Sequence, residues 1–138
     1  TLFPYTTLFR SGCETLSQLA VSAFMKTPSY ERYLRRLRKT LTQQRQQMSA
    51  AITRYFPPGT RITHPQGGTL LWVELPPEQA SMAFFHAALK AGIQILPGDI
   101  FSNAQRFNHF VRIGCGAPYS PTIDEALATL GRLLKNQS

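Results

Sequence analysis

The stretch from residue 28 to residue 56 constrains the fold of this chain more than any other feature of its sequence. Apolar residues recur through it at helical spacing, and the positions between them are mostly arginine, lysine and glutamine. The apolar stripe consists of Leu34, Leu37, Leu41, Met48, Ile52 and Tyr55. Pro28 suits the first turn of a helix, and Pro57-Pro58-Gly59 ends it. The pattern predicts one amphipathic helix, roughly 40 Å long at a rise of 1.5 Å per residue.

Shorter elements are predicted on both sides of this helix. A helix over residues 15–26 carries Leu16, Leu19, Ala20, Ala23 and Phe24. Strand patterns occupy residues 60–64, 69–75, 93–96 and 107–113. Between them a helix that closes at Gly92 carries Met82, Phe85, Ala88 and Leu89. A final helix that begins near Pro121 carries Ile123, Leu127, Leu130, Leu133 and Leu134. This order predicts a small sheet with helices on one face.

The first eleven residues, TLFPYTTLFRS, fit none of these patterns. They lack the charge order of a secretory signal, and Pro4 confines any strand to a sheet edge. All eleven are the translation, in one reading frame, of DNA that resembles a common sequencing-adapter oligonucleotide. We therefore expect residues 1–11 to be adapter-derived and the native sequence to begin near Gly12, as the tail of a longer protein.

Composition and charge exclude several classes of protein. The chain is 43% hydrophobic, enough to bury a core, and no apolar run reaches the length that spans a bilayer. Cys13 and Cys115 show neither metal-ligand spacing nor a disulfide framework, so we expect reduced core thiols in a cytoplasmic protein. The net charge is +8, with a basic cluster at Arg32, Arg35, Arg36, Arg38 and Lys39. Such a run is more typical of a solvated helix face than of a nucleic-acid contact.

The residues indicate no complete active site. The acidic residues are scattered, no serine lies in a nucleophile elbow, and no glycine-rich loop has phosphate-binding spacing. The histidines His64, His86 and His109 have no metal-ligand spacing and are interpreted as surface or edge residues.

Arg112 is the one residue that points to binding. It is the only charge in the predicted strand FNHFVRIGC. A buried guanidinium needs an anion or several acceptors, and its planar fork matches a carboxylate. Two alternatives stay open at this point: a core ion pair with Asp99 or Glu74, or the carboxylate of a ligand.

Three segments in order, PQGGTLLWVELP, AGIQILPGDIFS and RFNHFVRIGCG, resemble the C-terminal part of fold-type-I aminotransferases that use pyridoxal 5'-phosphate (PLP). Together with TLSQLAVSAFMKTPSYERYLRRLRKTL, they resemble most the GntR-type transcriptional regulators of the MocR class. Those proteins join an N-terminal winged helix-turn-helix DNA-binding domain to an aminotransferase-like domain. The resemblance covers residues 12–138.

The resemblance implies an α/β fold of PLP-dependent transferase type I, present as a C-terminal fragment. Residues 12–27 would end the large PLP domain, 28–57 would form an interdomain helix, and 58–138 a small α+β domain with a short, mainly antiparallel sheet. Arg112 would bind the carboxylate of an amino-acid-like substrate. Pro97 and Phe101 would lie in a turn beside the substrate. Gly67 and Gly68 would lie in a turn that lets the backbone approach the site closely; the alternative for these two glycines is an ordinary tight turn.

The resemblance also implies what this chain lacks. The Schiff-base lysine and most PLP ligands would lie upstream, so no catalytic residue is assigned and the chain should not hold PLP covalently. The intact protein would be a homodimer that binds PLP and an amino-acid-like effector. It would bind DNA through its N-terminal domain and would not associate with a membrane. The alternative is an aminotransferase that moves an amino group between an amino acid and a 2-oxo acid. A third interpretation is that the chain is a free-standing interaction domain. This interpretation is excluded if residues 1–11 are adapter-derived.

Overall fold

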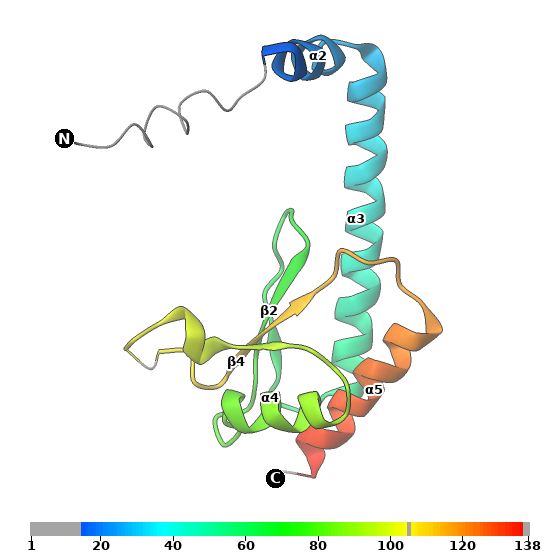
Figure 1. Ribbon diagram of the computed structural model, residues 1–138. Coiled ribbons are helices and arrows are strands. Elements are labelled where there is room, and N and C mark those ends of the chain that lie inside the picture. The colour runs from blue at the N-terminus through cyan, green and yellow to red at the C-terminus, as the bar shows by residue number, and fades with distance from the viewer. Residues whose placement is uncertain (1–14, 105, 137–138) are drawn as a thin grey trace, which may run out of the picture. The chain divides into compact units, whose positions relative to one another are not determined.

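A computed structural model describes residues 15–104 and 106–136 (Figure 1). The helices are α2 (Thr15–Met25), α3 (Pro28–Tyr55), α4 (Ser81–Lys90) and α5 (Pro121–Lys135), with a 3-10 turn, η1, at Gly98–Phe101. The strands are β1 (Arg61–Ile62), β2 (Leu70–Glu74), β3 (Leu96–Pro97) and β4 (Phe110–Gly114). Residues 1–11 and Cys13 lie outside the described residues, so the adapter interpretation stays a prediction.

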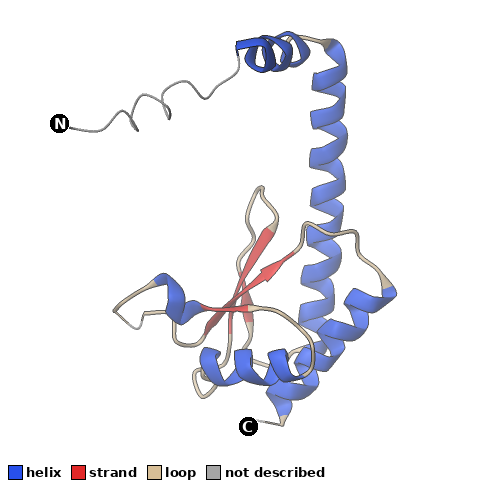
Figure 2. Cartoon of the chain, viewed as in Figure 1, coloured by secondary structure: helices blue, strands red, loops and turns tan. Residues whose placement is uncertain are grey.

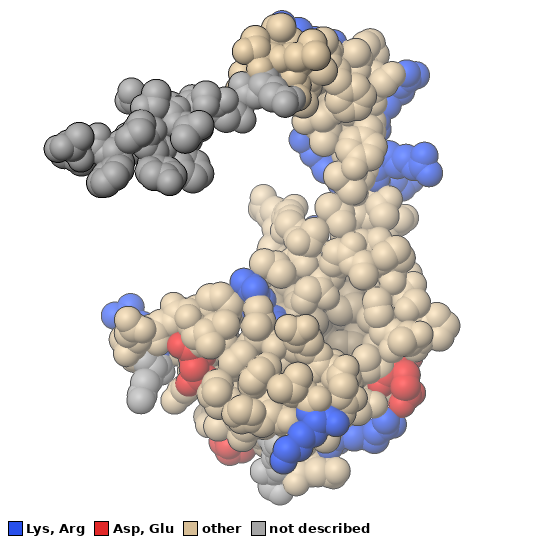
Figure 3. All heavy atoms as spheres, viewed as in Figure 1, with Lys and Arg blue, Asp and Glu red and all other residues tan. Residues whose placement is uncertain are grey.

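The long helix forms as the apolar stripe predicts. Thr27 precedes it, and its Oγ1 accepts a hydrogen bond from the backbone N–H of Tyr30 at 3.3 Å, which satisfies one of the free donors at the helix start. The chain divides into two compact units between Arg38 and Lys39, within α3. The basic cluster from Arg32 to Lys39 is exposed, as expected of a solvated helix face. Figure 3 shows lysine and arginine side chains along this part of α3.

The second unit is built on a four-stranded antiparallel sheet in the order β1-β2-β4-β3 (Figure 2). In the central pair Trp72 lies opposite Arg112, and Leu71 lies opposite Ile113. Side chains alternate between the two faces of a sheet, so this register fixes which residues share a face. The prediction of a small, mainly antiparallel sheet is confirmed.

One face of the sheet packs against α4, α5 and the C-terminal half of α3. The core comprises Met48, Ala51, Ile52, Phe56, Leu71, Val73, Leu75, Phe84, Ala88, Ile95, Val111, Ile113, Cys115, Leu127, Leu130 and Leu134. Cys115 is therefore a buried core thiol, and burial raises its pKa above the ordinary value of 9.0. The prediction of helices on one face is confirmed. Met48 and Ile52 of the apolar stripe belong to this core.

Several predicted elements have other bounds in the structure: the strand predicted at 60–64 is only β1, and the strand predicted at 107–113 begins at Phe110. The strand predicted at 93–96 is shorter and begins later, at Leu96, because the backbone N–H of Ile93 donates to the Ala88 carbonyl at the end of α4. In α4 itself, Phe84 and Ala88 face the core, whereas Met82 and Leu89 are exposed. Apolar residues of α4 lie on most sides of the helix, so the periodicity of the sequence alone could not show which side is buried.

A carboxylate joins α5 to α3. Ser120 caps α5 by accepting from the Ile123 N–H, and Asp124 in the first turn accepts hydrogen bonds from two phenols. Tyr55 Oη donates to Asp124 Oδ2 at 2.7 Å, and Tyr119 Oη donates to Asp124 Oδ1. The hydrogen bond from Tyr119 and then that from Tyr55 hold the pKa of Asp124 below its ordinary value of 3.8. The bond to Asp124 raises the pKa of Tyr119 to about 12.

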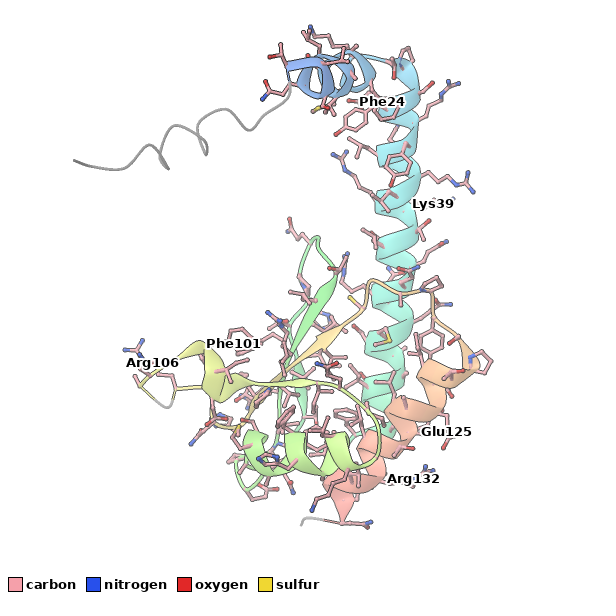
Figure 4. All side chains as sticks on the ribbon, in the orientation of Figure 1. Phe24, Lys39, Phe101, Arg106, Glu125 and Arg132 are labelled. Atoms are coloured by element: carbon pink, nitrogen blue, oxygen red, sulfur yellow. The ribbon has the colours of Figure 1, made fainter. Side chains whose placement is uncertain are left out.

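These shifts predict a pH dependence of stability. The stabilisation from the lowered pKa of Asp124 is present above about pH 4 and is lost as pH falls through its folded-state pKa. The stabilisation from the raised pKa of Tyr119 is complete below pH 10 and is lost as pH rises from 10 to about 12. Thermal unfolding should show Asp124→Asn with a lower Tm than the wild type at pH 7 and a smaller loss towards acid. The control is Glu125→Gln, because Glu125 and Arg132 form an exposed ion pair at 2.9 Å that is worth little (Figure 4). Equal Tm values for the two variants would contradict the role of Asp124.

The apolar side chains of α2 predict self-association. None of its residues is buried, and Leu16 is 79% and Leu19 62% exposed. Exposed apolar patches promote association in water. Light scattering should therefore show oligomers of the chain that the double variant Leu16→Gln/Leu19→Gln reduces. The variant Leu89→Gln, which changes a single exposed leucine on α4, should not reduce them. A monomeric wild type would contradict this prediction.

Candidate functional site

Arg112 lies on the sheet face opposite the core. In β4 the neighbouring Val111 and Ile113 are buried in the core, whereas Arg112 is only half-buried on the other face. Its partners in register are Trp72 on β2 and Leu96 on β3. The sequence suggested a charge buried in an apolar strand. The structure corrects this, because alternation turns the guanidinium away from its adjacent neighbours Val111 and Ile113, which face the core.

No carboxylate of the described chain pairs with this guanidinium. Glu74 contacts Arg61 at 3.6 Å and His109 at 3.9 Å. Asp99 accepts a hydrogen bond from the Ser81 hydroxyl. Among residues 15–104 and 106–136, the interaction formed by Arg112 is with a ring: its Cζ lies 4.8 Å from the centroid of Phe101. The core ion pair with Asp99 or Glu74 is therefore absent from the described residues.

Trp72, the register partner of Arg112, lies among aromatic rings that sequence reasoning did not find as a group. The ring of Trp72 lies 5.5 Å from Phe101, 5.4 Å from Phe107 and 5.6 Å from Phe110, centroid to centroid. We call Trp72, Phe101, Phe107 and Phe110 the aromatic cluster. The period-2 alternation of FVR in β4 is a signal that could have placed Phe110 beside Arg112 on one face.

The position of Phe101 depends on a close backbone approach at Gly98. A Cβ atom at Gly98 would lie 2.2 Å from the Phe107 carbonyl oxygen and 2.8 Å from that of Phe110. Only glycine allows η1 to lie this close to the segment that leads into β4. Ser81 binds the same region, since its N–H donates to the Asn108 carbonyl at 2.7 Å. The 3-10 turn is thus fixed against β4, and Phe101 at its end lies beside the sheet (Figure 4).

The other predicted site residues are placed differently. Pro97 lies opposite Val111 in register and is buried with the core, so it does not share the face of Arg112. Gly67 and Gly68 lie in the loop between β1 and β2. Gly68 has φ +84°, which favours glycine, and its carbonyl accepts from Arg45 Nη1 at 3.4 Å. A Cβ at either glycine would meet no atom within 4 Å. The structure thus brings Arg112 and Phe101 together, and no described contact joins either glycine to them.

Potential metal ligands and lysine side chains were compared with the position of Arg112 in the described residues. No three histidine, cysteine or acidic side chains in residues 15–104 and 106–136 could hold a metal ion. Of the lysines, Lys39 belongs to α3, Lys90 and Lys135 end α4 and α5, and Lys26 follows α2. None lies on the strands of the sheet. Within the described chain, no helix is long and apolar enough to cross a membrane.

Comparison with known proteins identifies the family. The model for aminotransferase class I and II matches residues 5–130, which is most of the chain. The chain belongs to this aminotransferase family. The expected fold follows, because the LysN α-aminoadipate aminotransferase of Thermus thermophilus, solved in complex with N-(5'-phosphopyridoxyl)-L-leucine, superposes with a TM-score of 0.75 at 29% identity. That comparison covers 88% of this chain and 31% of the other.

Its relatives in sequence include both regulators and enzymes. The chain is 34% identical over 115 residues to the uncharacterised HTH-type transcriptional regulator YjiR of Escherichia coli, which is 83% of this chain and 24% of YjiR. It is 31% identical over 120 residues to the 2-aminoadipate transaminase of Thermus thermophilus, 87% of this chain and 30% of the enzyme. The chain thus spans less than a third of the length of these relatives. Its resemblance to GntR-type regulators and PLP aminotransferases is confirmed.

The residues of this chain do not fit the covalent binding of PLP that the family implies. A Schiff base needs a lysine at the site, and no described lysine lies on the strands that carry Arg112 and the aromatic cluster. The cationic, aromatic surface suits the carboxylate of a small molecule instead.

The approach at Gly98 predicts a destabilised variant. Gly98→Ala places a methyl group 2.2 Å from a backbone oxygen, so the turn or β4 has to move. Overpacking of this kind costs on the order of 1–3 kcal/mol of the free energy of unfolding. Urea denaturation should show this loss. Gly67→Ala is the matched control and should be nearly neutral, since its Cβ meets no atom and its φ is not positive. An equally stable Gly98→Ala would contradict the close approach.

Proposed function

We propose that this chain is the C-terminal part of a MocR/GntR-type transcriptional regulator whose aminotransferase-like domain binds PLP and an amino-acid-like effector. Arg112 receives the carboxylate of that effector. Residues 12–27 end the large domain, 28–57 form the interdomain helix and 58–138 the small domain. DNA binding belongs to an N-terminal helix-turn-helix domain, and the protein acts as a homodimer.

The observation that carries this proposal is the unpaired guanidinium on the open sheet face. Arg112 has a ring contact and no carboxylate partner among the described residues. A guanidinium in partly apolar surroundings gains most from an anion that takes two parallel N–H···O bonds. A free α-carboxylate has this geometry, and all α-amino acids carry one.

The choice of a regulator is supported by sequence. YjiR is named a transcriptional regulator and is 34% identical, and the basic stretch YERYLRRLRKTL resembles that class. PLP, held by residues outside this chain, supplies an electron sink to the amino group of a bound amino compound. The residues of this chain hold the other end of the molecule, its carboxylate.

A second candidate is a PLP-dependent aminotransferase. It is favoured by the 31% identity to a protein named 2-aminoadipate transaminase and by the superposition on an aminotransferase. Assays on the full-length protein separate the two. A regulator should bind operator DNA with an affinity that changes on addition of amino acids, whereas an aminotransferase should release a 2-oxo acid from them at many turnovers. Turnover without DNA binding would overturn the first proposal.

The carboxylate role of Arg112 is tested by substitution in the full-length protein. Arg112→Ala should weaken amino-acid binding, measured from the PLP absorbance, by on the order of 2–4 kcal/mol. Arg112→Lys should not restore it, because an ammonium lacks the planar fork. PLP itself should stay bound in both variants. The control is Arg106→Ala, because Arg106 is exposed on the loop between η1 and β4 (Figure 4). Unchanged amino-acid affinity in Arg112→Ala would contradict the proposal.

A further inference from the structure

We infer that Phe101 is a positioning residue for Arg112: its ring holds the guanidinium at the sheet face without neutralising it, so that the charge remains available to a carboxylate ligand. This inference rests on the proposed carboxylate site and adds to it a role for a residue that does not itself bind the anion. It predicts that the ring of Phe101, and not merely its bulk, sets the affinity of that site.

The geometry is that of a cation–π contact. Arg112 Cζ lies 4.8 Å from the ring centroid, within the range of about 6 Å in which the negative face of a phenyl ring attracts a cation. A ring differs from a carboxylate in one decisive way. It attracts the positive charge but does not accept strong N–H···O bonds, so the guanidinium donors remain unused.

The carboxylate nearest to Phe101 in the sequence does not pair with Arg112. Asp99 lies two residues before Phe101 in the same 3-10 turn and could serve as an alternative anchor. Its Oδ2 instead accepts a hydrogen bond from Ser81 at the start of α4. An internal carboxylate on Arg112 would compete with any ligand for the same donors, because the two need the same fork. Anchoring by a ring avoids that competition.

Phe101 is itself held from two sides. Its ring makes an edge contact with Trp72 at 5.5 Å, and the turn that carries it is fixed by the close approach at Gly98. Trp72 lies opposite Arg112 in the sheet register. The ring and the guanidinium therefore belong to one rigid arrangement, although Phe101 is 41% exposed. Preorganisation of this kind improves affinity because less side-chain freedom is lost on binding.

The experiment measures carboxylate binding by NMR, with sodium acetate as the probe, to the 138-residue chain that carries Leu16→Gln/Leu19→Gln to reduce self-association; this chain is the wild type for the Phe101 variants. Acetate has no side chain, so the Nε–Hε signal of Arg112 reports carboxylate pairing alone. We expect saturable binding in the wild type and a Kd about three- to fivefold higher in Phe101→Leu, the loss that matches a cation–π contact at a partly exposed site. Phe101→Tyr, which keeps the ring, should bind acetate like the wild type. In Phe101→Leu the Hε signal should also move downfield, because the shielding of the ring is lost.

Ile100→Ala is the matched control, since Ile100 lies in the same turn, is 59% exposed and should leave the acetate Kd unchanged. A Phe101→Leu variant that binds acetate as tightly as the wild type would overturn the positioning role while leaving the carboxylate site intact. An equal loss in Phe101→Tyr and Phe101→Leu would overturn it too. A wild-type Arg112 signal that does not respond to acetate would overturn the carboxylate site itself, and the role of Phe101 with it.

Discussion

Burial of one sheet face, and only one, governs the rest of this structure. Side chains of β2 and β4 alternate, so the register that sends Val73 and Val111 into the core also sends Trp72 and Arg112 to the opposite face. Burying each of these valines is worth about 1.5–3 kcal/mol, and a slip of one residue would exchange the two faces. The position of the guanidinium is therefore fixed by the hydrophobic core behind it.

The face that carries Arg112 depends on two contacts that lie outside the strands. The absence of a Cβ at Gly98 lets η1 approach β4, and the Ser81 N–H bond to the Asn108 carbonyl ties the start of α4 to the same segment. Both contacts are between backbone and small residues, so they add rigidity without adding charge. They place Phe101 over Arg112 while the carboxylate of Asp99 is directed to Ser81. Local packing has thus selected which side chain meets the guanidinium.

Much of the fold follows from sequence patterns, and the failures have physical causes. The long helix, the antiparallel sheet and the last helix follow from strong periodicity and from proline and glycine at their ends. The buried face of α4 does not, because seven of its ten residues are apolar and they lie on several sides of the helix. The sequence identifies Arg112 as a lone charge, and the resemblance places Phe101 beside it, but Trp72 is not predicted there, since it meets Arg112 only through strand pairing. Such contacts join residues far apart in the chain, where local patterns carry no information.

An unneutralised arginine also suits a protein that has to respond to its ligand. A ligand shifts a conformational equilibrium only by as much as its affinities for the two states differ. A guanidinium that is half-buried, held by a ring and without an internal carboxylate gains strongly from an anion that reaches its donors in one state and not in the other. Both proposed functions, regulator and enzyme, can use an arginine of this kind, since it holds a ligand by the group that does not react.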